Sequence, residues 1–313
     1  MKGLDLLLQA ESRIKGNVLN FSECIGDEFY YHYTGIEAFM NIFKPGNEKN
    51  INFWLSSILF MNDNEEFFHG VNILIKEIKN FYSKSIGKKE KDFSDRIIRF
   101  LESTSLGESI FSCSFSRHSD LLSQWRGYCP PSGGVSIGLS RKIFHSLSDQ
   151  YAGVSGNLMR VIYDEDEKIF VARSVIENSI GEFLSIVKEQ GCNERDFLFV
   201  SFCEYLAILG SCFKNPGFYE EEEFRYIWKY PYYDIIREIY DPAFWNINKK
   251  FRSARGLMIP YVEKFFYVEG SNVELCIGPA PRQNLNEISV MNFIRQNTIK
   301  PKITLSKTTY RAN

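Results

Sequence analysis

The sequence lacks the features that mark membrane, secreted and zinc-binding proteins. It contains no run of about eighteen apolar residues, the length that a membrane-spanning helix needs. It has seven cysteines, an odd number, with no pair at C-x-x-C spacing, and its four histidines are scattered. Cysteines such as Cys113 stand in apolar surroundings, as buried and reduced thiols do. We therefore expect a cytoplasmic protein that does not bind a membrane.

An excess of charge of either sign is also missing. The chain has 37 basic and 39 acidic residues, a formal net charge of −2, so no overall positive field would hold it on nucleic acid. These totals leave a local basic patch open. The remaining composition is that of a globular protein, with 44% hydrophobic residues, and the aromatic content of 15% favours a sheet-rich core.

The common catalytic signatures are absent as well. There is no glycine-rich phosphate loop, no serine nucleophile elbow and no H-E-x-x-H motif. The candidates for function are therefore short polar and aromatic motifs that stand beside predicted strands.

Strand and helix patterns alternate along the whole chain, without a long linker or an internal repeat. Predicted strands lie at residues 28–34, 52–56, 110–115, 135–139, 159–163, 222–228, 256–260, 265–268, 274–278 and 303–305. Predicted helices lie at 36–43, 62–83, 97–101, 287–296 and, as a pair, within 167–212, and residues 121–128 are expected to form a short helix or a turn. This order predicts an α+β fold in a single domain, with a central, largely antiparallel sheet, continuous or split, flanked by helices. We expect a helical segment at 1–28, the main domain at 29–280, and a helix and strand at 281–313 packed on that domain.

The most informative segment, residues 219–228, joins four consecutive glutamates to an aromatic strand pattern. As a strand it places aromatic rings on a core-facing side and Glu221, Glu223 and Arg225 on the opposite side. Neighbouring carboxylates repel unless one is protonated or a cation neutralises them, so such a pattern is compatible with a functional site. A solvated acidic run with one Arg–Glu salt bridge explains the segment equally well.

Polar and aromatic residues beside other strands form the second group of candidates. His32 and Thr34 stand at the end of a strand, where a ring nitrogen and a hydroxyl can bind a ribose or a phosphate. A lone strand histidine is, however, more often a hydrogen-bonded core residue. Trp125 and Tyr128 are three residues apart and could flank a flat ring, although packing in the core is at least as good an interpretation.

The order of these short motifs resembles the bacterial domain-of-unknown-function family 2971 over roughly residues 29–280. The motifs that carry the resemblance are Tyr31–Thr34, Trp54–Ser57, Asn62–Glu65, Cys113–Ser116, Trp125 with Tyr128, Phe213–Lys214, Glu221–Arg225, Ile259–Tyr261 and Ile277–Pro279. Each motif is short, so the specificity of the resemblance lies in their order. The family name carries no activity.

A remoter likeness is to the ADP-ribosyltransferases. His32 with Thr34 on a first strand, Ser56 at the end of a second, and a late Glu221-x-Glu223 look like their three-part signature. The likeness implies an NAD-consuming enzyme in which His32 and Thr34 hold the ribose of NAD. It implies further that Glu223 is the catalytic carboxylate, which stabilises an oxocarbenium-like centre, and that Glu221 positions the acceptor.

The same likeness extends the NAD-binding set to Tyr33, Ser56 and Arg225, with Trp125 or Tyr128 stacking on a ring. It implies an ADP-ribosyltransferase-like fold and a toxin or phage-defence effector that modifies a protein or a nucleic acid. The sequence does not identify the acceptor.

Two other functions fit the same residues. Asp63 and Glu65 with Glu221 and Glu223 supply hard oxygen ligands, so a magnesium-dependent hydrolase or nuclease is one alternative. A non-catalytic ligand-binding or sensor module of a defence system is the other, and in it the glutamates merely pair with Arg225 or a lysine. A buried, fully neutralised Glu–Arg cluster would favour the sensor, as would the absence of an open cleft at His32.

Overall fold

The structure is a computed structural model that describes residues 12–18, 28–44, 49–60, 64–83, 88–103, 109–144, 156–189, 192–229, 249–254 and 256–308. The described strands are β1 (Phe29–Gly35), β2 (Asn50–Ser57), β3 (Ile110–Ser116), β4 (Gly134–Ser140), β5 (Asn157–Arg160), β6 (Glu223–Lys229), β7 (Lys250–Ala254), β8 (Leu257–Tyr267), β9 (Val273–Ile277) and β10 (Lys302–Leu305). The described α-helices are α2 (Ile36–Ile42), α3 (Asn64–Ser83), α4 (Lys88–Leu101), α5 (Leu122–Tyr128), α6 (Arg141–Phe144), α7 (Glu165–Glu189), α8 (Cys192–Gly210) and α10 (Gln283–Arg295).

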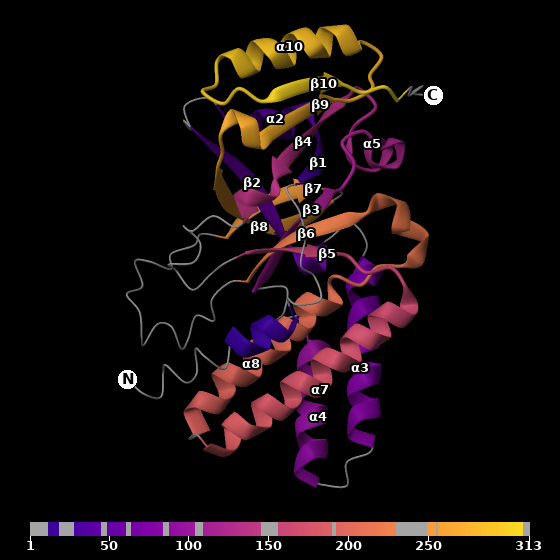
Figure 1. Cartoon of the computed structure of the whole chain (residues 1–313), viewed down its shortest axis with the longest axis vertical. Helices are drawn as coiled ribbons and strands as arrows, with labels where there is room; N and C mark the ends of the chain where they lie inside the picture. The colour runs from indigo at the N-terminus through magenta and orange to yellow at the C-terminus, as the bar shows by residue number, and fades with distance from the viewer. Residues whose placement is uncertain are drawn as a thin grey trace.

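These elements follow one another along the long axis of the molecule (Figure 1). Helices α3, α4, α7 and α8 form a bundle at one end, the sheet fills the middle, and α10 covers the other end. The described strands form one sheet in the order β10-β9-β4-β1-β3-β2-β8-β7, with β6 paired to β3 and β5 to β6. Its strand pairs are antiparallel except for β9 with β10, so the prediction of a largely antiparallel sheet flanked by helices is confirmed.

The sheet divides at β3. One edge of β3 pairs with β6 from Ile110 to Ser116. On the other edge, Ser116 pairs with Tyr31 of β1, whereas Ser112 pairs with Ser56 of β2. The strands β1 and β2 therefore leave opposite ends of one edge, and no described strand pairs with the middle of β3 between them. The sheet is split, which is one of the two forms that the sequence left open.

Two hydrophobic cores lie on opposite faces of this sheet. The first is shared with the helical bundle and includes Ile110 and Ile227. The second is rich in aromatic rings and takes in α2, α6 and α10. Because alternate residues of a strand point to opposite faces, Phe224, Tyr226 and Trp228 of β6 lie in this second core, as the sequence predicted.

The two ends of the chain pack on these cores where they are described. Residues 12–18 are helical, and Ile14 and Val18 belong to the first core. At the other end, Val290 and Ile294 of α10 belong to the second core, and β10 extends the sheet beside β9. None of the helices in the described ranges combines the length and hydrophobicity needed to span a bilayer.

One part of the strand prediction is wrong. The predicted strands 256–260 and 265–268 are a single strand, β8, and its hairpin partner β7 was not predicted. The polar Glu263 and Lys264 interrupt the apolar pattern, and Pro260 indicates a break. The structure accommodates Pro260, which has no backbone N–H, because β8 pairs with β2 only from Tyr261 onward.

Candidate functional site

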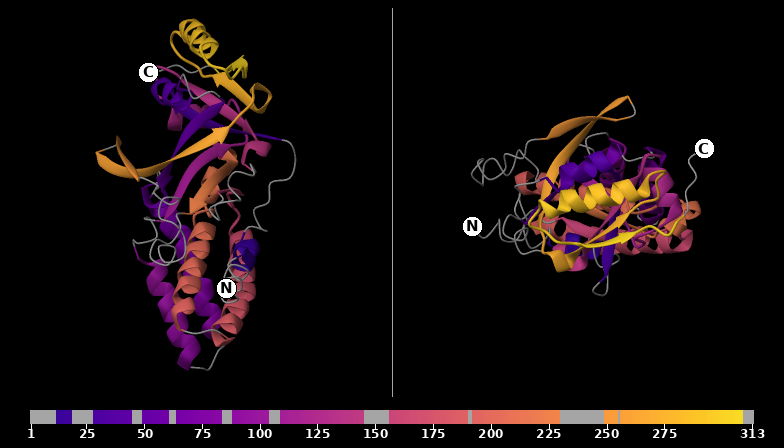
Figure 2. Two further views of the ribbon diagram at one scale, coloured as in Figure 1. Left: turned by 90° about the vertical axis from the view of Figure 1, so that its left-hand side faces the viewer. Right: turned by 90° about the horizontal axis from the view of Figure 1, so that it is seen from above.

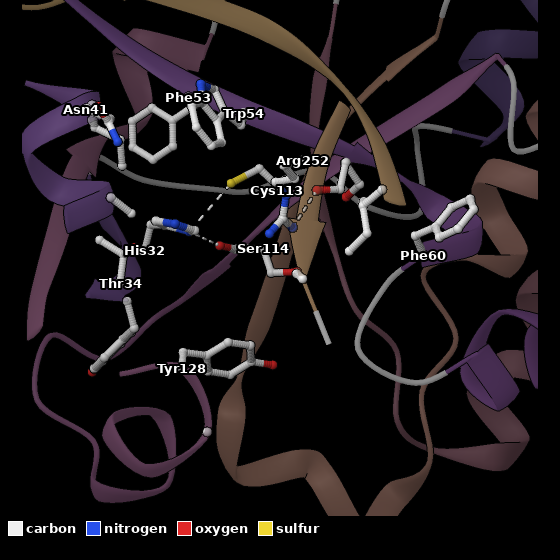
Figure 3. A pocket seen from close by; sticks show the side chains of 18 of the residues that line it. His32, Thr34, Asn41, Phe53, Trp54, Phe60, Cys113, Ser114, Tyr128 and Arg252 are labelled. Carbon is white, nitrogen blue, oxygen red and sulfur yellow. Dashed lines mark hydrogen bonds between the residues drawn. The ribbon is translucent and has the colours of Figure 1, made fainter. Parts of the chain in front are cut away.

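A cavity of about 640 Å³ lies where β1 and β2 diverge from β3 (Figure 3). Its described walls come from β1, α2, β2, the 3-10 turn Ile58–Phe60, β3, α5 and the β7–β8 hairpin. This volume is within the range of small-molecule sites, which is roughly 300–1,000 Å³. The split of the sheet thus creates a pocket of ligand size, and the sequence-predicted His32, Tyr33, Thr34, Ser56 and Tyr128 all line it.

His32 is the central polar group of the pocket. Its Nδ1 lies 2.9 Å from the backbone oxygen of Ser114, which is accessible because no described strand pairs with that part of β3. A carbonyl can only accept, so Nδ1 carries the proton and donates, and Nε2 is left as an acceptor. Burial lowers the pKa of His32, and the bond to Ser114 opposes that shift only in part. The imidazole is therefore neutral at neutral pH and can accept a hydrogen bond from a ligand hydroxyl.

Cys113 lies beside this ring, with its Sγ 3.5 Å from Nδ1 of His32. A Cys–His pair at this distance suggests a nucleophile, but the His32 proton on Nδ1 already points to Ser114. Burial also raises the pKa of the Cys113 thiol to about 12. The group is a neutral thiol at neutral pH and not an activated nucleophile.

Arg252 supplies the positive charge of the pocket. It extends from β7, and its Nη2 donates to Oγ of Ser56 at 3.1 Å. Apart from His32, Arg252 is the only ionisable cation among the described lining residues, and none of them is an aspartate or glutamate. The described walls thus carry a net positive charge, which suits an anionic ligand.

The hydroxyl of Ser112 is a polar group of the pocket that is buried and lacks a hydrogen-bond partner in the described structure. Buried polar atoms nearly always have a partner in native proteins. Since Ser112 lines the pocket, a ligand is one way to supply that partner.

Aromatic rings form the remaining walls. Trp54 stacks on Tyr261 with ring centroids 4.6 Å apart and an interplanar angle of 28°. In the view of Figure 3, Phe53 and Trp54 lie toward one end of the pocket and Tyr128 toward the other. The pocket therefore offers flat apolar surfaces beside its polar groups, as a site for a ring-bearing ligand does.

The other predicted binding residues have structural partners. The hydroxyl of Tyr33 accepts from the backbone N–H of Leu121 at 2.9 Å and donates to the backbone oxygen of His118 at 2.7 Å. Trp125 does not belong to the described lining; it is 3% exposed, and its Nε1 donates to Asp120 at 2.7 Å. Of the two rings predicted to stack on a ligand, the structure places Tyr128 in the pocket and Trp125 in a core.

The glutamate-rich segment forms a separate, buried cluster. Glu223 binds Arg225 through two contacts, at 2.7 and 2.9 Å, and Lys214 at 2.8 Å. Lys214 also donates to Glu221 at 2.7 Å, and Arg225 donates to the backbone oxygen of Ser211. Glu223 and Arg225 lie on the β6 face opposite the aromatic side chains, as predicted, but that face is buried and not solvated.

Electrostatics within this cluster keep Glu223 ionised. Burial alone would raise the pKa of Glu223, but the adjacent Arg225 and Lys214 outweigh it and lower the pKa to about 2. Neither Glu221, Glu223 nor Arg225 is among the described residues that line the pocket. The cluster therefore has the geometry of a structural ion pair, and the catalytic role of Glu223 stays a prediction.

Comparison with known protein families bears on this region. A family model described as protein of unknown function (DUF2971) matches residues 124–226. Residues 124–226 resemble that family. The resemblance predicted from the sequence motifs is confirmed over this range. The range begins in α5, which contributes to the pocket, and ends at Arg225 and Tyr226 of β6. No curated protein and no solved structure matches the chain.

The family 2971 region does not contain every residue of the pocket. Arg252, Asn41 and Phe60 line it and were not predicted from the sequence. Arg252 was missed because β7 was not predicted, although the basic run in which it stands marks the segment as unusual. Lys214 was noted only as part of a family 2971 motif, and its pairing with Glu221 and Glu223 becomes evident from the fold alone.

The magnesium alternative has little support in the described residues. Asp63 and the side chain of Glu65 lie outside them. Glu221 and Glu223 are already held by Lys214. Within the described ranges, no group of three or more histidine, cysteine, aspartate or glutamate residues is placed to hold a metal ion.

Proposed function

We propose that the pocket in the split sheet binds NAD or a nucleotide of the same class, and that the protein acts as a ligand-binding module. The observation that carries the proposal is the composition of that pocket. A fixed imidazole acceptor on His32, a guanidinium on Arg252 and the rings of Trp54 and Tyr128 surround one cavity of ligand size.

Each of these groups matches one part of a nucleotide. A ribose hydroxyl can donate to Nε2 of His32, whose other nitrogen is held by Ser114. The guanidinium of Arg252 suits a phosphate, because its donors match two phosphate oxygens at once. The flat base or nicotinamide suits the aromatic walls. Thr34 and Ser56 add hydroxyls to the same walls.

Binding without transfer is favoured by the position of the acids. Departure of nicotinamide from NAD leaves an oxocarbenium-like centre, which a nearby carboxylate stabilises. No carboxylate belongs to the described lining, and Glu223 is neutralised by Arg225 and Lys214. The neutralised cluster is one of the two features expected of a sensor, whereas the cavity at His32 is the reverse of the other.

An ADP-ribosyltransferase-like enzyme is the second candidate, and one observation favours it. His32 and Ser56, which carry the likeness to that family, stand on the two strands that diverge around the pocket. Transfer or hydrolysis would release free nicotinamide, so a chromatographic assay of nicotinamide separates the two functions. Release by the wild-type protein above a no-protein control would establish the enzyme in place of the passive module.

Isothermal titration of the full chain with NAD tests the binding proposal. Arg252→Gln removes the charge of the pocket and His32→Phe removes its acceptor while keeping a ring. Because a hydrogen bond to a charged group contributes about 1.5–3 kcal/mol, we expect Arg252→Gln to weaken NAD binding by about tenfold or more. His32→Phe should weaken it less, because its partner is a neutral hydroxyl.

Lys302→Gln is the matched control. Lys302 lies on β10, at the other end of the sheet order from β7, and its side chain is 71% exposed. Its NAD affinity should equal that of the wild type, and circular dichroism should show all three variants folded. Absence of NAD binding by the wild type, or equal binding by all variants, would refute the proposal.

A further inference from the structure

The β7–β8 hairpin projects away from the body of the molecule, as both views of Figure 2 show. Four rings from β8 and the neighbouring β2 lie on one side of it: Trp54, Tyr261, Phe265 and Tyr267. The strand register places them together, because Ser56 pairs with Tyr261, Trp54 with Glu263, and Asn52 with Phe265. We call this surface the aromatic face.

The aromatic face is open although its rings are large and apolar. Phe265 is 52% exposed and Tyr267 is 56% exposed. Trp54 is 37% exposed and stacks on Tyr261 beneath it, so its outer side is presented to the surroundings in a fixed orientation. Rings held in this way are platforms on which another flat group can stack.

Positive charge accompanies these rings. Residues 249–269 contain five basic and two acidic side chains, an excess of three positive charges in a chain whose net charge is −2. Lys250 lies on the aromatic face, since it pairs in register with Tyr261. Lys49 lies over the ring of Tyr267, with its Nζ 5.6 Å from the ring centroid. Both lysines also bind carboxylates, Lys250 to Glu263 at 2.6 Å and Lys49 to Glu269 at 3.5 Å. Within the described structure, Arg252 is therefore the cation of this face without a carboxylate partner, and a phosphate would compete with Glu263 and Glu269 for the two lysines.

The aromatic face is continuous with the pocket. Trp54 belongs to both, since it stacks on Tyr261 and also lines the cavity. Arg252 lies two residues beyond Lys250 on the same face of β7 and reaches the cavity, where it contacts Ser56. A polymer bound along the aromatic face would thus pass the mouth of the pocket.

We propose that the aromatic face, with Lys49, Lys250 and Arg252, is a docking surface for single-stranded nucleic acid. Proteins that bind single strands combine a positive groove for the backbone with aromatic rings on which successive bases stack. An acidic peptide would use the cations but not the rings, and an apolar partner would use the rings but not the cations. The idea that the bound nucleic acid also enters the pocket, as an acceptor or as a competing ligand, rests on the function proposed above. Binding of the nucleic acid to the aromatic face does not depend on that function.

Fluorescence anisotropy of a labelled single-stranded RNA of about twelve nucleotides, without NAD, tests this proposal. The double variant Phe265→Ala/Tyr267→Ala removes two exposed rings and no charge. Because each ring that is removed takes away a surface on which a base can stack, we expect the double variant to bind the RNA about tenfold more weakly or worse. Binding by the wild type should also weaken as salt rises, because phosphates are neutralised by lysine and arginine.

Phe170→Ala is the matched control, because Phe170 is 64% exposed on α7 in the helical bundle. It should bind the RNA as the wild type does. The double variant should retain the NAD affinity of the wild type, since neither Phe265 nor Tyr267 belongs to the described pocket lining. Failure of NAD binding and failure of RNA binding are therefore separate results.

Four outcomes would overturn the proposal. The first is no binding of RNA by the wild type at low salt, and the second is equal binding by the double variant. The third is displacement of the RNA by polyglutamate at equal charge concentration, which would mark an acidic-peptide site. The fourth is a dimer, detected by light scattering, that the double variant dissociates, which would mark a contact between two copies of this chain.

Discussion

Substitution of Glu223 by glutamine tests whether the buried cluster is structural. The carboxylate accepts from Arg225 at 2.7 and 2.9 Å and from Lys214 at 2.8 Å, and it is 4% exposed. Glutamine keeps the shape but removes the charge, and it turns an amide donor toward two cations. Loss of one partner of a buried ion pair costs about 3–5 kcal/mol. Because Lys214 retains Glu221, we expect the lower end of that range.

The pH dependence of stability provides an independent magnitude. The pKa of Glu223 is about 2 in the folded protein against an ordinary value of 4.5. A carboxyl whose pKa is lowered by folding stabilises the fold fully above its ordinary pKa. That contribution is lost as the pH falls from 4.5 toward 2, and it amounts to roughly 3 kcal/mol. The two routes to the magnitude agree.

Urea unfolding followed by far-ultraviolet circular dichroism measures both effects. At neutral pH the free energy of unfolding of Glu223→Gln should be about 3 kcal/mol below that of the wild type. At about pH 3 most of this difference in the free energy of unfolding should disappear, because the wild type then loses most of the stabilisation that ionised Glu223 provides. Glu220→Gln, the same substitution at an exposed neighbour, should stay within about 0.5 kcal/mol of the wild type. A Glu223→Gln protein as stable as the Glu220→Gln control would refute a structural role.

Three further predictions concern the pocket and its surroundings. NAD binding should weaken at acidic pH, because protonated His32 no longer accepts a hydrogen bond at Nε2. Burial lowers the pKa of His32, so this loss should begin below pH 6.5, the ordinary pKa of histidine, and titration calorimetry across pH measures it. Native Cys113 should resist alkylation at about pH 8, since burial raises its pKa to about 12, whereas unfolded protein should react, as peptide mass spectrometry would show. Trp125→Phe should lower the free energy of unfolding by about 1–3 kcal/mol, because the half-buried carboxylate of Asp120 loses one of its donors, without changing NAD affinity.

The sequence predicted those features of the fold that local patterns determine. The alternation of aromatic and charged residues around Phe224 and Arg225 placed each set on the correct face of β6, since a strand has a strict period of two. The pattern does not reveal what covers the charged face. Four consecutive glutamates suggested solvent, but Lys214 and the carbonyl of Ser211 enclose Glu223 and Arg225 from the end of α8.

The pocket was predictable only where a residue stood beside a recognisable motif. Tyr128 and Trp125 were equal candidates in the sequence, and the choice between them depends on Asp120, which holds Trp125 in the core. Arg252 could not be assigned to the site, because it reaches Ser56 across 196 residues of sequence. Contacts of this range are set by the order of strands in the sheet, which one sequence does not specify.

The split in the sheet explains why the polar groups gather at this point. In a continuous sheet the carbonyl of Ser114 would accept from a neighbouring strand, and an unpaired one would cost about 1–3 kcal/mol. At the split His32 provides the donor, so the same contact that satisfies Ser114 fixes the imidazole tautomer and directs Nε2 away as an acceptor. Ser112 lies two residues before Ser114 on β3 and lines the same cavity. Its hydroxyl has no hydrogen-bond partner in the described structure. The gap that β1 and β2 leave beside β3 therefore creates both the space for a ligand and the polar groups that require one.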